Sequence, residues 1–328
     1  MIDRICELDY RGAAIGGIKA FGPRPSRAAG EPAMRKFAYE TVDVFTEDRF
    51  GGNQLAVFTD ARGLSDAEMQ SLAAEMNYSE TTFVLPPDDS ANTARVRIFT
   101  RSHEMPFAGH PNVGTGFVLA RHGRDREGVL SFEEIAGLVE VRIANGPDGE
   151  VTGATIAAPQ PLSTGIELPA DAIAACTGLA PSDIVVGNHR PVRASVGVHF
   201  VLAEVTAEAL SRATPDLSHF RAVRDANPGL EGRFSLFIYA RDGANIRARM
   251  FAPISGTWED PATGSASATL AALLLSLDGG DSAAFTLTQG VEMGRPSLLR
   301  LTAQRGADGI RATVGGSCVP VFRGEALL

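Results

Sequence analysis

The sequence predicts an α+β protein in which one structural unit occurs twice. Short strand patterns run through most of the chain, and two apolar helical segments each follow a glycine-containing loop. The segments RIFTRSHEMPFAGHPNVGTG and RMFAPISGTWEDPATGSASA, which lead into these helices, also match. The matched pairs are Arg97 with Arg249, Phe99 with Phe251, and Gly109 with Gly264. Because motif, order and following helix agree, we favour a tandem duplication with two facing copies over chance similarity.

The first copy begins with two short strands, starting at Phe37, on either side of a turn at Gly51-Gly52-Asn53. A helix is predicted over 65–76, because Ser65 suits the N-cap and Glu68 completes a capping box. Alternating apolar residues then predict strands over 81–87 and 94–100, followed by a helix at about 111–122.

The chain continues with a meander of short strands, with turns predicted at Gly137 and over 145–149. The second copy begins with a helix over 169–179 that Gly178 ends. Alternation and apolar runs then predict the remaining elements: strands over 195–205, 233–241 and 245–253, a helix over 265–277, and mostly strands beyond it.

Composition limits the classes of partner. The 328 residues carry a formal net charge of −9, which argues against nucleic acid or an anionic membrane as the main partner. A small anionic substrate needs only a local positive field. Three widely spaced cysteines fit a reducing cytoplasm better than a disulfide framework or a zinc site. No apolar stretch approaches the roughly 20 residues that span a bilayer.

Residues 1–33 differ from the rest of the chain. They lack a continuous apolar segment, carry acidic residues early, and become rich in Gly, Pro, Arg and Ala, so they make a poor signal peptide. We expect a disordered leader, or an upstream start with Met34 as the natural beginning. The functional residues are expected after this segment.

The two matching loops are suited to anion binding. A helix N-terminus has unpaired N–H groups and about half a positive charge. In the first loop Gly109 allows close approach of the backbone, and Pro111 suits the first helical turn. Gly264 and Ser265 occupy the equivalent place in the second loop. Either loop alone is an ordinary helix start, but two at matching positions favour a site for a carboxylate or a developing oxyanion.

Three side chains near these loops are candidates for proton chemistry. Glu80 is either a solvated loop acid or an acid/base whose pKa burial raises toward neutrality. His110 is either a capping histidine or a site residue, and Asp260 is either a turn acid before Pro261 or a site residue. Residue types and spacing alone leave these alternatives open.

Four motifs in order resemble the PhzF-like phenazine-biosynthesis family, within the superfamily of diaminopimelate epimerases and proline racemases. They are DVFTEDRFGGNQLAVF, NYSETTFV, MPFAGHPNVGTG and EDPATGSASATLAALL. The resemblance runs from about Phe37 to near the C-terminus. It implies two similar, pseudo-twofold-related domains, 34–160 and 161–328, each a curved sheet wrapped around a central helix. The last strand is expected to pack back on the first domain.

The resemblance also implies an isomerase with a cofactor-free site in the cleft, which forms a homodimer. Position by position, Glu80 corresponds to the catalytic acid/base. The residues corresponding to those that bind the substrate are Ser79, Gly109, His110, Asp260, Gly264 and Ser265, with the two glycines as backbone donors. The two cysteines of the related epimerases would fall near Ala108 and Asp260. Since neither position holds a thiol, a one-base proton transfer by Glu80 is favoured.

Other chemistries fit the sequence less well. A hydrolase with Ser265 as nucleophile lacks the G-x-S-x-G motif, and GHPNVGTG is not the dinucleotide motif G-x-G-x-x-G. His103, Glu104 and His110 match no metal-ligand spacing. A non-catalytic carboxylate-binding protein remains an alternative. The resemblance therefore implies an isomerase that moves a proton on a small carboxylate without cofactor or metal, similar to the family's trans-2,3-dihydro-3-hydroxyanthranilate isomerase.

Overall fold

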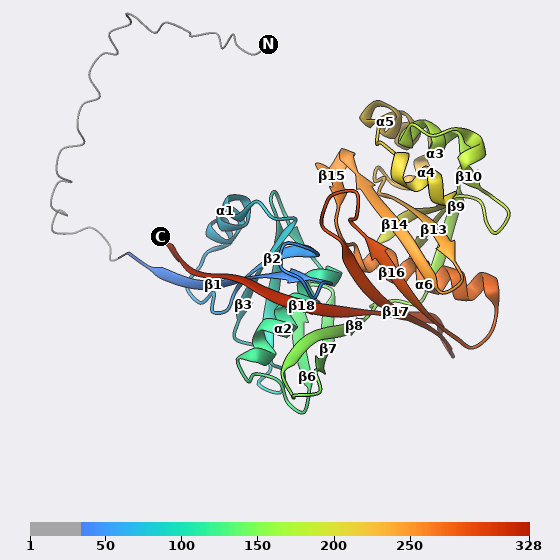
Figure 1. The fold of residues 1–328 in the computed structure, drawn as a ribbon. Coiled ribbons are helices and arrows are strands. Elements are labelled where there is room, and N and C mark those ends of the chain that lie inside the picture. Colours follow the sequence, from blue (N-terminus) through green and yellow to red (C-terminus); the bar gives the residue numbers. More distant parts are fainter. Residues whose placement is uncertain (1–33) are drawn as a thin grey trace, which may run out of the picture. The chain divides into compact units, whose positions relative to one another are not determined.

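The computed structural model describes residues 34–328, so the expectations for residues 1–33 lie outside the described residues. Lys36–Leu327 form one compact unit, drawn in Figure 1. Its first half contains these elements: β1 (Lys36–Val44), β2 (Asn53–Phe58), α1 (Asp66–Met76), β3 (Glu80–Leu85), β4 (Ala94–Thr100), β5 (Glu104–Met105), α2 (Gly109–Arg121), β6 (Val129–Glu134), β7 (Gly137–Asn145) and β8 (Val151–Ala157).

The second half follows after β9 (Ser163–Glu167). It contains α3 (Ala170–Thr177), β10 (Ile184–Val185), β11 (Val192–Ser195), β12 (His199–Val205), α4 (Ala207–Arg212), α5 (Leu217–Ala226), β13 (Leu236–Asp242), β14 (Asn245–Ala252), β15 (Thr257–Asp260), α6 (Gly264–Asp278), β16 (Ser282–Gln289), β17 (Ser297–Gly306) and β18 (Gly309–Leu327). Three short 3-10 helices, Pro181–Asp183, Pro228–Leu230 and Pro253–Ser255, complete it.

Strand pairing repeats between the two halves. In the first half β2 and β3 are parallel, β3 and β4 antiparallel, and β4 and β6 parallel, and β7 and β8 follow as an antiparallel meander. In the second half β12, β13, β14, β16, β17 and β18 pair in the same order and sense. The predicted α+β duplication is therefore confirmed as a repeated strand pattern.

Each half packs its sheet against one central helix. Every residue of α2 from Gly109 to Ala120 is buried, and nearly all of α6 from Gly264 to Leu275 is buried as well. Helix α2 contacts strands of the first half and α6 contacts β16, β17 and β18. Such burial on all sides identifies both as core helices.

The last strand joins the two halves. One part of β18 pairs with β17 and β8, and its later part pairs with β1, alongside which it runs in Figure 1. The boundary at residue 160 stays a prediction. The expected strand over 195–205 differs from the structure, because Gly197 with φ of 142° separates β11 from β12.

Candidate active site

Glu80 is the first residue of β3, where it pairs with Leu55 of β2 and Thr100 of β4. Its side chain is 17% exposed and therefore largely withdrawn from water. Burial raises the pKa of Glu80, and the negative charge of Asp260 raises it further. A carboxyl group in these surroundings holds its proton at a higher pH than an ordinary glutamate, which suits a group that exchanges protons near neutrality.

His110 lies in the first turn of α2, next to Glu80. Its Nε2 atom is 3.4 Å from Oε2 of Glu80, although this buried nitrogen makes no well-aligned hydrogen bond to any residue that the structure describes. Burial lowers the pKa of His110 to about 3, so the ring is neutral at physiological pH. A neutral ring contributes a polar neighbour rather than a charge to the Glu80 carboxyl.

Asp260 ends β15 and is held by hydrogen bonds to both carboxylate oxygens. Asn53 donates from Nδ2 to Oδ1 over 2.9 Å, and Thr263 donates from Oγ1 to Oδ2 over 2.6 Å. Burial raises the pKa of Asp260, while these two donors act against that rise. Asp260 is therefore the carboxyl of the pair that ionises first, and Glu80 the one that retains its proton.

Three polar residues that the sequence did not predict as site residues organise this pair. Asn53, at the start of β2, also accepts from Ser79 Oγ over 3.0 Å and lies 3.4 Å from Nδ1 of His110. Gln289 donates to Asp260 O and to Thr263 Oγ1. Asn53 and Thr263 lie within two of the four motifs, where the sequence did not single them out. Gln289 lies outside the motifs and reaches the site through folding, so no local pattern marks it.

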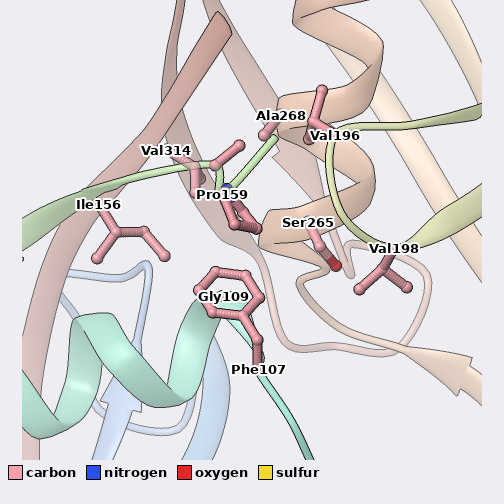
Figure 2. A pocket seen from close by; sticks show the side chains of 10 residues that line it. Phe107, Gly109, Ile156, Pro159, Val196, Val198, Ser265, Ala268 and Val314 are labelled. Carbon is pink, nitrogen blue, oxygen red and sulfur yellow. The ribbon is translucent and has the colours of Figure 1, made fainter. Parts of the chain in front are cut away.

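The N-termini of the two central helices meet beside these carboxyls. A Cβ atom added at Gly109 would lie 3.2 Å from the Ser265 nitrogen and 3.3 Å from the Gly264 Cα. Neither N-cap residue, Ala108 or Thr263, caps its helix with a side-chain hydrogen bond. Gly109 and Ser265 also line a small apolar pocket, shown in Figure 2. The backbone N–H groups at both helix starts are thus available to one anionic group.

One cleft of about 960 Å³ contains all the predicted site residues. They are Ser79, Glu80, Gly109, His110, Asp260, Gly264 and Ser265. Phe107 and His199 line the same cleft, whereas Tyr78 and Trp258 do not. The structure thus brings the seven predicted site residues together in one cleft. The role of each residue stays a prediction.

The contacts bear on the alternatives drawn from the sequence. The His110 ring lies near Glu80 and Asn53, and in the described part of the chain it makes no hydrogen bond to Ser265 that would support a hydrolase dyad. Glu104 forms a two-bond ion pair with Arg97, and His103 bonds to Thr100. Within residues 34–328 no group of three potential ligand side chains is placed to hold a metal ion. No helix in the same range has the length and apolar character to span a membrane.

Known proteins with similar sequences carry the name isomerase. An uncharacterized isomerase from Mesorhizobium japonicum is 38% identical over 306 residues, which cover 90% of this chain and 100% of that protein. The trans-2,3-dihydro-3-hydroxyanthranilate isomerase of Pseudomonas aeruginosa is 36% identical over 297 residues, covering 88% of this chain and 99% of that enzyme. The protein is therefore an isomerase, as predicted.

A more specific assignment follows from the family comparison. The model of the phenazine biosynthesis-like protein family, PhzC-PhzF, matches residues 42–324, and the chain belongs to this family. The fold agrees. A PhzF-family phenazine biosynthesis protein from Bacillus anthracis superposes with a TM-score of 0.79 at 24% identity, covering 90% of this chain and 100% of that one. The resemblance found in the four motifs is confirmed.

Proposed function

We propose that this isomerase moves a proton on a small carboxylate substrate, with Glu80 as the single acid/base. One observation carries the proposal: the buried Glu80–Asp260 pair lies in the same cleft as two uncapped helix N-termini. The relative from Pseudomonas aeruginosa is named for trans-2,3-dihydro-3-hydroxyanthranilate. This ring acid is the first substrate to test.

In the proposed reaction, ionised Glu80 removes a proton from carbon and then returns it to another carbon of the substrate. The raised pKa supports this role, because a carboxyl that titrates near neutral pH both accepts and donates a proton readily. Asp260, fixed by Asn53 and Thr263, orients the substrate. Neutral His110 supports Glu80 without neutralising it.

The helix ends would hold the substrate carboxylate and the negative charge that develops on it. Removing a proton from an activated carbon places charge on oxygen, and preorganised N–H donors stabilise that charge. Loss of one such donor typically costs about 3–4 kcal/mol of activation free energy. Gly109, Gly264 and Ser265 supply donors that no side-chain cap occupies.

Three further features belong to the proposal. The protein acts without cofactor, because Glu80 and the helix ends suffice for proton transfer. It works in the cytoplasm as a homodimer, as its family resemblance implies, and light scattering measures its mass directly. Its partner is a small anion rather than nucleic acid or a membrane, in keeping with a net charge of −9. A carboxylate-binding protein without turnover is the alternative that the next experiment addresses.

The test follows isotope uptake in D₂O with dialysed enzyme and trans-2,3-dihydro-3-hydroxyanthranilate. We expect a product of unchanged composition with deuterium, partial or complete, at the new C–H position. Replacing Glu80→Gln should reduce kcat by about 100-fold or more, because general acid–base catalysis contributes that much. Exposed Glu75→Gln is the matched control and should leave kcat unchanged.

Three results would contradict the proposal. One is a Glu80→Gln variant that keeps most of its kcat. Another is a product that differs from the substrate by added water or a lost group. The third is turnover that requires an added cofactor. Substrate binding without any turnover by the wild-type protein would favour the alternative.

A further inference from the structure

Arg101 lies in a well-defined turn at the wall of the cleft. Thr100, before it, accepts at Oγ1 from the backbone N–H groups of Ser102 and His103, over 3.2 and 3.1 Å. The Thr100 N–H donates to the His103 carbonyl, and the side chain of Gln70 donates to the Thr100 carbonyl. The exposed Arg101 side chain therefore extends from a fixed backbone.

The Arg101 guanidinium reaches from the first half to the second. One terminal nitrogen donates to the backbone carbonyl of Gly256, just before β15, over a long 3.4 Å. Its positive charge acts on both Glu80 and Asp260, lowering the pKa of each against the effect of burial. Arginine has five N–H donors, so this one long bond leaves most of them for a ligand.

The other arginines of the cleft are placed differently. Arg193 is neutralised by Glu231 at 2.7 Å. Burial is the main cause that lowers the pKa of His199, and the positive charges of Arg193 and, to a smaller extent, Arg233 lower it further. The charge of Arg233 therefore acts near His199. Arg101 has no carboxylate partner among residues 34–328, and it is the cleft arginine whose charge reaches both Glu80 and Asp260.

The cleft also has room beyond the proton-transfer centre. Its volume of about 960 Å³ lies at the upper end of the roughly 300–1,000 Å³ that drug-sized ligands occupy. A small acid held at the two helix ends fills only part of it. The remaining space borders Arg101, whose planar fork binds a carboxylate through two parallel hydrogen bonds.

We propose that Arg101 binds a second carboxylate, so that this enzyme binds small dicarboxylic acids more tightly than monocarboxylic acids such as the ring acid named above. One carboxylate lies at the N-termini of α2 and α6, and the other at Arg101. This inference rests on the proposed function, because it takes the helix ends as the first anion site. Arg101 thereby determines which acids the cleft selects.

The experiment compares the binding of benzoate with that of phthalate, isophthalate and terephthalate by isothermal titration calorimetry at one pH. The three dicarboxylates place the second carboxylate at different distances. We expect one of them to bind about tenfold tighter than benzoate, as a charge-assisted two-bond contact provides. Arg101→Met should remove this advantage by weakening the preferred dicarboxylate more than benzoate, and Arg101→Lys should keep part of it. Arg233→Met, the matched control, should keep all of it.

The outcomes separate the two claims. Benzoate binding without preference for any dicarboxylate overturns the inference alone. A preference that survives Arg101→Met, or one that Arg233→Met abolishes, also overturns it. Absence of binding by all four acids overturns the inference together with the proposed anion site at the helix ends. A melting curve for each variant verifies its folding.

Discussion

At the scale of single residues, the surroundings of buried carboxyl groups decide their charge. Asp260 has two hydrogen-bond donors to its oxygens, whereas the pKa of Glu80 is raised by burial and by Asp260 itself. Two neighbouring acids are thereby given different protonation behaviour. Glu134, outside the site, shows the same rule, because neither of its buried oxygens has a well-aligned partner among residues 34–328.

The pH dependence of folding stability should reveal Glu134. Burial raises its pKa to about 8, so the folded state retains a proton that the unfolded chain loses above its ordinary pKa of 4.5. Stability therefore falls as pH rises between these values, by up to about 1.4 kcal/mol per pH unit. Glu134→Gln, which never ionises, should raise the melting temperature at pH 9 and change it little at pH 4.

The control for this prediction is the adjacent residue. Glu133 accepts from the backbone N–H groups of Asp88 and Asp89 and from Asn92, which lower its pKa. Glu133→Gln should lower stability at neutral pH, since the stabilisation by an acid with lowered pKa is present above its unfolded pKa. Identical pH profiles for Glu134→Gln and wild type would contradict the assignment of Glu134.

Sequence reasoning located part of the site at this scale. Glu80, His110 and Asp260 lie in distinctive motifs, and the fold brings them into one cleft. Asn53, Gln289 and Arg101 were missed, because their importance arises from contacts with residues far away in the chain. A polar residue whose partners are set by long-range packing carries no local signal in one sequence.

At the scale of elements, the sequence predicted helix ends best where residues that are close together in the chain make the capping contact. The capping box of Ser65 and Glu68 forms as expected at the start of α1, and Gly178 caps α3 in the left-handed conformation. Helices α4 and α5 were not predicted. Helix α4 has only six residues, and α5, although amphipathic, is mostly polar and buries only Phe220.

Each copy of the repeat contains an ion pair of the same kind. Arg97 bonds to Glu104 through two nitrogens, and the matching Arg249 bonds to Glu259 in the same way. Each arginine also lies over the phenylalanine two residues later, at 5.1 and 4.9 Å from the ring centroid. The paired residues that indicated a duplication in the sequence therefore perform the same packing in both halves.

The meeting of α2 and α6 gives a prediction about one glycine. Gly109→Ala places a Cβ 3.2 Å from the Ser265 nitrogen and 3.3 Å from Gly264, so the two helix ends must separate by a few tenths of an ångström. Misplacement of this kind affects positioning strongly, and we expect kcat to fall by about tenfold or more. Gly187→Ala, where the Cβ meets nothing within 4 Å, is the control and should keep wild-type kcat. Equal activity of both variants would show that the spacing of the helix ends is unimportant.

At the scale of the whole molecule, the two halves are joined by strands as well as by the central helices. Strand β8 of the first half pairs antiparallel with β18, which continues to pair with β1. The matching motifs predicted the duplication, but nothing in the sequence predicted these strand pairings. Strands that are far apart in the sequence leave no local pattern that identifies them as partners. The junction makes Lys36–Leu327 one compact unit.

This junction requires glycine where β8 and β18 come closest. A Cβ at Gly153 would lie 2.1 Å from the Gly316 carbonyl oxygen, a backbone atom that moves only with its strand. Gly153→Ala should therefore lower the free energy of unfolding by about 1–3 kcal/mol, as overpacking does. Gly165→Ala in β9, whose nearest neighbour would be at 3.6 Å, is the control and should change stability little.

Two probes in urea unfolding show whether the junction couples the halves. Far-UV circular dichroism reports the whole chain, and the fluorescence of Trp258, the single tryptophan, reports the second half. Strand β18 pairs with strands of both halves. Weakening its contact with β8 should therefore also destabilise the second half, which does not contain Gly153. We expect one transition, with both midpoints lowered together by Gly153→Ala. A shift of the circular dichroism midpoint with Trp258 unfolding as in wild type would show that the halves unfold independently.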